Sequence, residues 1–280
     1  MASSTDPALQ LAENALTRRL AKQVRLDESG YCLRAEDNLI ATVGPGVWQR
    51  ARGDLARGKG DELAGKFRAP YSSAALAVNT FAPLLSGVSL PGPVEVRGDI
   101  AFEQQRSAWA GGYWPTLDLV VEADEYPVRL FVESKCTEFL RKGHPGFSDA
   151  FVKHARKQLD GTAAATYEQL ADDAHMFDPL DARQLAKHFL AAKRAVIESS
   201  QPGTVILLCI WWEPHDAAEH PVFGRHRAAV DAFAAAVPDT DVAVAGISYS
   251  ELWDHWEALN DPLIARHTQL LRDRYDVPLR

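Results

Sequence analysis

Three charged residues with catalytic potential stand in two apolar runs of the chain. Asp118 lies in the run over residues 115–122, and Glu133 and Lys135 close the run over residues 128–135. Apolar and β-branched residues on both sides of a short charged break predict a β-hairpin. Because side chains alternate between the two faces of a strand, Glu133 and Lys135 share a face. A suitable register would bring Asp118 to the same place.

A divalent cation would explain why these charges converge. Carboxylates are rarely buried unless they are paired or bind a metal, and Asp118 and Glu133 would repel each other. Mg²⁺ prefers oxygen ligands, so the two carboxylates and the Ser134 carbonyl could hold it, with Mn²⁺ as a substitute. A bound metal polarises a phosphate and activates water, while the Lys135 ammonium stabilises developing negative charge. The pattern therefore indicates phosphodiester hydrolysis, with a solvated strand end as the alternative.

The spacing Pro-x-x-Asp before Glu-x-Lys resembles the PD-(D/E)XK nuclease superfamily. Further segments are similar to a prokaryotic restriction-endonuclease-like family within it, so that the resemblance covers residues 60–255; these segments are residues 72–81, 131–138 and 210–214. The resemblance implies a Mg²⁺-dependent deoxyribonuclease that acts in restriction or defence. Asp118 and Glu133 would then bind the metal, and Lys135 would position the attacking water.

The resemblance also implies accessory residues near the metal. Superfamily members often carry a glutamate on the helix before the sheet, for which Glu62 is a candidate, and Glu103 near the end of the first strand is the second. They often use a polar residue on the helix after the Glu-x-Lys strand, where Gln184, Lys187 and His188 share one face. An ordinary first-turn glutamate and a generic exposed helix face are the alternatives.

DNA is the expected partner, although the formal net charge of the chain is −8. An acidic protein can bind DNA only if its basic residues gather on one face. Lys153, Arg156 and Lys157, on a helix after the hairpin, are the candidates for contacts to the DNA backbone. A solvated helix face would have the same composition.

The order of the expected elements indicates an α/β protein with a mixed central sheet flanked by helices. This matches the restriction-endonuclease-like core, here as one nuclease-like unit over residues 61–280 with a helical extension over residues 1–60 packed on it. The 27–60 stretch is rich in turn residues. The expected strands cover residues 94–104, 115–122, 128–135, 204–212 and 242–247, and the expected helices cover residues 7–26, 72–81, 149–159, 181–198, 223–237, 251–259 and 262–274.

Composition limits the compartment and leaves several functions open. The three cysteines fit no metal motif and favour a reducing compartment, so we expect a cytoplasmic protein without a membrane span. Tryptophans in the apolar runs are expected in the core. The alternatives to a deoxyribonuclease are an RNA or repair nuclease and a non-catalytic nucleic-acid-binding or interaction module on the same fold. A homodimer is also left open.

Overall fold

The computed structural model describes residues 7–58, 63, 65–92, 94–109, 114–123, 125–141, 146–159, 161–199 and 202–279. Its helices are α1 Pro7–Ala21, α2 Pro45–Arg57, α3 Ser73–Phe81, α4 Asp149–Gln158, α5 Gly161–Asp172, α6 Ala182–Glu198, α7 Pro221–Ala236, α8 Tyr249–Ala258 and α9 Pro262–Tyr275. Its strands are β1 Gly87–Leu90, β2 Val94–Arg97, β3 Asp99–Gln105, β4 Thr116–Glu122, β5 Val128–Lys135, β6 Thr204–Trp211 and β7 Val242–Ser248.

A five-stranded mixed sheet with the order β3-β4-β5-β6-β7 forms the centre of the structure. Strand β4 pairs antiparallel with both β3 and β5, whereas β6 pairs parallel with both β5 and β7. The short strands β1 and β2 pair separately. Parallel strands need a crossover, and long helical connections between β5 and β6 and between β6 and β7 supply it. The predicted mixed α/β architecture of a restriction-endonuclease-like fold is confirmed.

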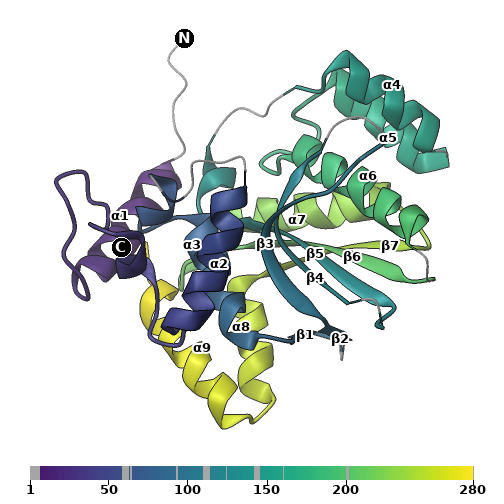
Figure 1. Ribbon diagram of the computed structural model, residues 1–280. Coiled ribbons are helices and arrows are strands. Elements are labelled where there is room, and N and C mark those ends of the chain that lie inside the picture. The colour runs from purple at the N-terminus through teal and green to yellow at the C-terminus, as the bar shows by residue number, and fades with distance from the viewer. Residues whose placement is uncertain are drawn as a thin grey trace.

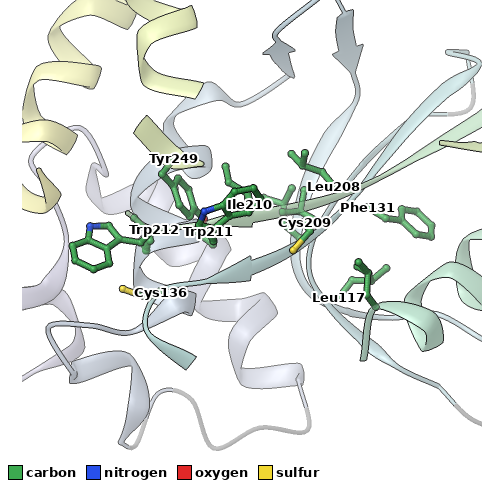
Figure 2. Close-up of a cluster of buried hydrophobic side chains, with 14 of the residues drawn as sticks. Leu117, Phe131, Cys136, Leu208, Cys209, Ile210, Trp211, Trp212 and Tyr249 are labelled. Atoms are coloured by element: carbon green, nitrogen blue, oxygen red, sulfur yellow. The ribbon is translucent and has the colours of Figure 1, made fainter. Parts of the chain in front are cut away.

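Helices cover both faces of this sheet. Helices α6 and α7 lie together along one side of it, while α3 and α8 lie on the other (Figure 1). Strand β6 is an almost uninterrupted apolar run because both of its faces are buried. Figure 2 shows side chains of this strand and its neighbours in the core. The four tryptophans at 211, 212, 253 and 256 are each 1 % exposed or less, as predicted.

Side-chain caps explain several helix starts that the sequence predicts. Ser72 Oγ accepts the backbone N–H of Ala75 at the start of α3, and Asp181 Oδ1 accepts that of Gln184 at the start of α6. The apolar runs around the charged break form the hairpin of β4 and β5, as expected. Among the described residues, none of the helices has the length and apolar composition needed to cross a membrane.

The prediction was wrong in the segment before the hairpin. Helix α2 lies where turns were expected, because Trp48, Ala51 and Leu55 are spaced to bury one helical face despite the surrounding glycines and arginines. The single strand expected over residues 94–104 is divided into β2 and β3 at Gly98. A Cβ at Gly98 would lie 2.4 Å from the backbone carbon of Glu122, so only glycine fits this close approach.

Candidate active site

Asp118 and Glu133 lie opposite each other where β4 and β5 separate. The pairing of the two strands ends at Leu119 and Val132, so Asp118 and Glu133 are the next residues in the same register. The backbone N–H of Ser134 donates instead to Asp118 Oδ2 over 2.6 Å. A carboxylate thus takes the place of a ladder carbonyl, which fixes the Asp118 side chain at the point of separation.

Glu133 is 3 % exposed and has two basic neighbours. Its Oε1 lies 2.5 Å from Lys135 Nζ, and its Oε2 lies 2.8 Å from Nε2 of His188 on α6. The contact between Glu133 Oε2 and His188 Nε2 is not an aligned hydrogen bond, since neither atom has a hydrogen-bond partner. Burial alone would raise the pKa of Glu133, but Lys135 and His188 outweigh it and lower that pKa to about 2.

Asp118 has the opposite electrostatic environment, although its side chain keeps partial contact with solvent. Burial and the nearby Glu133 raise its pKa well above the ordinary value, and Glu103 adds to this rise. Lys135 and the Ser134 N–H oppose the rise without cancelling it. The two carboxylates therefore form a coupled pair in which Asp118 protonates first, because both cannot ionise freely without a cation.

Lys135 is held by residues from two elements. Besides Glu133, its ammonium donates to Gln184 Oε1 on α6 over 2.8 Å. Its side chain is 16 % exposed. Burial would lower the pKa of Lys135, but the negative charges of Glu133 and Asp118 outweigh burial and raise it. The structure therefore fixes a charged ammonium directly beside the carboxylate pair.

Helix α6 brings two of its three candidate residues to this site. Gln184 and His188 lie one helical turn apart and reach Lys135 and Glu133, respectively. Lys187 points elsewhere, with its Nζ 5.9 Å from the centroid of the Phe147 ring. Burial lowers the pKa of Lys187. Strand β5 and the first turns of α6 thus form one connected polar cluster.

The structure places Glu103 on the other side of Asp118. Strands β3 and β4 pair Phe102 with Leu119 and Gln104 with Leu117, so Glu103 and Asp118 occupy the intervening position. Glu103 has a φ of 51°, a left-handed conformation that is strained for residues other than glycine. Glu103, Asp118 and Glu133 therefore stand in line across three strands. The other candidate, Glu62, lies outside the described residues.

The oxygen atoms of this cluster fit a hard divalent cation. Among the residues that the structure describes, no group of three or more His, Cys, Asp or Glu side chains could hold a metal ion. Two carboxylates are sufficient for Mg²⁺, which keeps several waters when bound. Glu133 Oε2 is buried without a hydrogen-bond partner. The Ser134 carbonyl points to the same side as its N–H, which donates to Asp118, so it is a suitable third ligand.

The candidate DNA-binding residues lie on α4. This helix is distant from the cluster in the sequence, but it contacts the segment between β3 and β4. Lys153, Arg156 and Lys157 are exposed, and Arg156 Nε lies 2.7 Å from Glu168 Oε1. His154 stacks on Trp109 with ring centroids 4.4 Å apart. Because Trp109 follows β3, this stack anchors α4 to the connection that leads into β4 and Asp118.

One buried histidine near Lys135 was not found from the sequence, because α7 carries no recognisable motif around it. His226 is fully buried, with its ring centroid 4.2 Å from that of Phe139 and 5.1 Å from that of Trp211. Neither ring nitrogen has a hydrogen-bond partner. Burial lowers its pKa to about 3, and the charges of Lys135 and Arg227 contribute. His226 is therefore neutral near pH 7.

We expect His226 to make the folded protein sensitive to acid. The unfolded chain takes up this proton below pH 6.5, the ordinary pKa, but the folded protein does so only near pH 3. The contribution of neutral His226 to the free energy of unfolding is thus fully present above pH 6.5. As pH falls below 6.5, this contribution is lost at about 1.4 kcal/mol per pH unit. Urea unfolding between pH 7.5 and 5 should show a shallower decline for His226→Phe than for the wild type. Parallel declines would contradict this assignment.

Comparison with known proteins supports the restriction-endonuclease-like fold. No curated protein and no solved structure matches the chain. A family model described as restriction endonuclease associating with ARP, abbreviated REase-ARP, matches residues 18–276. This match includes the whole sheet and the cluster around Glu133, and it indicates a nuclease-like function. The chain belongs to the restriction-endonuclease-like family described as restriction endonuclease associating with ARP.

Proposed function

We propose that this protein is a Mg²⁺-dependent deoxyribonuclease that hydrolyses phosphodiester bonds of DNA. The observation that carries the proposal is the adjacent pair of Asp118 and the buried Glu133, with Lys135 Nζ 2.5 Å from Glu133 Oε1. Asp118, Glu133 and the Ser134 carbonyl would hold Mg²⁺, and Mn²⁺ would substitute for it. The bound ion would polarise the phosphate and lower the pKa of a water molecule.

The surrounding side chains have separate roles in this proposal. An ammonium has three donor hydrogens, and Lys135 gives two of them to Glu133 and Gln184. The third can orient the attacking water or contact a phosphate oxygen, and the fixed positive charge stabilises the charge that develops there. Gln184 orients the ammonium. His188 limits the movement of the Glu133 carboxylate, and Glu103 could extend the metal site from β3.

Family membership supports restriction or defence as the biological setting. The family description names a restriction endonuclease and an association with ARP, so an association with ARP is part of this proposal. The principal rival is a non-catalytic nucleic-acid-binding module on the same fold. The close grouping of Asp118, Glu133 and Lys135 favours catalysis, because a binding module would not need these ionisable groups with shifted pKa values in one place.

A nuclease panel distinguishes the two functions. Purified protein would be incubated with supercoiled, linear duplex and single-stranded DNA and with RNA, in Mg²⁺, Mn²⁺ or a chelator. The proposal predicts metal-dependent cleavage of at least one DNA substrate. Binding to DNA without cleavage in either metal would favour the rival, and cleavage confined to RNA would reassign the substrate.

We further propose that α4 contacts the DNA backbone through Lys153 and Lys157. Removing either phosphate-binding charge should reduce the slope of log affinity against log salt by about one, without changing sequence preference. Arg156→Ala should have a smaller effect, because Glu168 already neutralises part of this charge. DNA affinity would be measured from low to moderate salt for each variant. Lys22→Ala, at an exposed lysine beyond α1, is the control; equal slopes in all four variants would exclude α4 from the interface.

A further inference from the structure

One large aromatic side chain is exposed at the end of the sheet that carries the cluster. Trp114 is 50 % exposed, whereas the other six tryptophans of the chain are each 8 % exposed or less. Tryptophan is usually buried because its large apolar ring is costly to leave in water. Tryptophan is enriched at binding surfaces, so the exposed ring of Trp114 is a candidate for a contact outside this chain.

The strand geometry places Trp114 on the same face of the sheet as the proposed metal site. The carbonyl of Pro115 accepts the backbone N–H of Arg106 over 3.1 Å, which extends the pairing of β3 and β4 by one step. Side chains alternate along a strand, so Trp114 and Asp118 lie on the same side. Four residues of extended chain span about 13 Å at roughly 3.3 Å each. Trp114 thus stands on the approach to the carboxylates.

The chemistry of an indole ring limits what this partner can be if the site acts on DNA. An exposed aromatic ring binds nucleic acid by stacking on a base, and every base has a suitable face. In a duplex both faces of a base are covered by its neighbours, so stacking requires an unpaired base. A separation of about 13 Å corresponds to about four nucleotides of a stacked strand at 3.4 Å each, or fewer if the strand is extended.

We propose that Trp114 is a stacking subsite for an unpaired base of single-stranded DNA, a few nucleotides from the phosphate that is cut. This inference rests on the proposed function, since it takes DNA as the substrate of the Asp118 site. It adds to that function a preference for substrates with an unpaired segment next to the scissile bond. Trp109, the other tryptophan between β3 and β4, has a different role because it is buried against His154 of α4.

Oligonucleotide binding tests the subsite with a matched control. Fluorescence anisotropy would report the affinity for a single-stranded oligonucleotide and for its duplex, using the wild type, Trp114→Ala, Trp114→Phe and Tyr126→Ala. Tyr126 is 38 % exposed but lies between β4 and β5, at the opposite end of β4. Quenching of tryptophan emission by the oligonucleotide would be followed in parallel, because a ring that stacks on a base is quenched directly.

The subsite predicts a selective loss of single-strand affinity. Trp114→Ala should weaken binding to the single strand by about 5- to 150-fold, the range for one stacked base, and should change duplex binding far less. Trp114→Phe should retain most of the affinity but lose the quenching, and Tyr126→Ala should behave like the wild type. Equal affinities of Trp114→Ala and wild type for the single strand would overturn the subsite.

The outcomes also separate the subsite from the proposed function. A wild type that cuts duplex DNA in Mg²⁺ but does not bind the single strand would overturn the subsite and leave the nuclease proposal intact. A wild type that neither cuts nor binds any DNA would remove both. Circular dichroism of the variants would exclude misfolding as the cause of weaker binding.

Discussion

Replacing Lys135 by alanine should reduce the single-turnover rate of DNA cleavage by about 10²- to 10⁴-fold, the range for a group that transfers protons or stabilises charge in the transition state. Binding of Mn²⁺ should persist, because an ammonium has no lone pair to give to a metal. DNA binding should also persist. This separation of binding from chemistry distinguishes a catalytic lysine from one that only stabilises the fold.

The Lys135 experiment needs variants that control for stability. Removing the ammonium leaves Glu133 buried with less compensation, so Lys135→Ala is expected to be less stable than the wild type. Lys135→Gln keeps most of the length of the side chain and a donor while removing the charge, and it should be similarly inactive. Lys193→Ala breaks a comparable ion pair with Asp239 at the far end of α6 and should cut normally. A Lys135→Ala protein that cuts near the wild-type rate would refute the role.

The second large effect is expected for Asp118→Asn. The asparagine oxygen can still accept the Ser134 N–H, so the local fold should be retained. Removing one carboxylate also relieves the repulsion that raises the pKa of Asp118, and the metal-free variant should melt no lower than the wild type. The proposed metal ligand is removed, however, so cleavage and stabilisation by Mn²⁺ should both disappear.

Calorimetry with Mn²⁺ and melting with and without Mn²⁺ would check this prediction. Asp54→Asn is a matched control, because the Asp54 carboxylate also accepts a backbone N–H from a strand, that of Phe102 on β3. The control should bind Mn²⁺ like the wild type. Undiminished Mn²⁺ affinity in Asp118→Asn would show that this carboxylate is not a ligand.

The sequence was most informative where local pattern and chemistry coincide. The hairpin of β4 and β5 follows from alternating apolar runs, and the side chains of Glu133 and Lys135 share a face for the same reason. The start of α6 follows from Asp181 as its cap. The spacing of Gln184, Lys187 and His188 places them on one side of this helix, and two of them reach β5.

Other features depend on tertiary contacts that local patterns do not encode. The apolar spacing in α2 is short and interrupted by glycine and arginine, so turn signals concealed it. The division between β2 and β3 is caused by the close approach of Gly98 to Glu122. That Lys187 turns to Phe147 while His188 turns to Glu133 depends on how α6 is rotated against the sheet. The sequence could name the candidates on α6 but not separate them.

Cleavage of supercoiled plasmid DNA during a Mg²⁺ titration tests the central claim most directly, with wild type and Asp118→Asn purified in the same way. We predict that the wild type cuts the plasmid as Mg²⁺ is added, stops when a chelator is added, and resumes when Mg²⁺ is restored, while Asp118→Asn leaves the plasmid intact throughout. Failure of the wild type to cut in either Mg²⁺ or Mn²⁺, or equal cutting by both proteins, would contradict it.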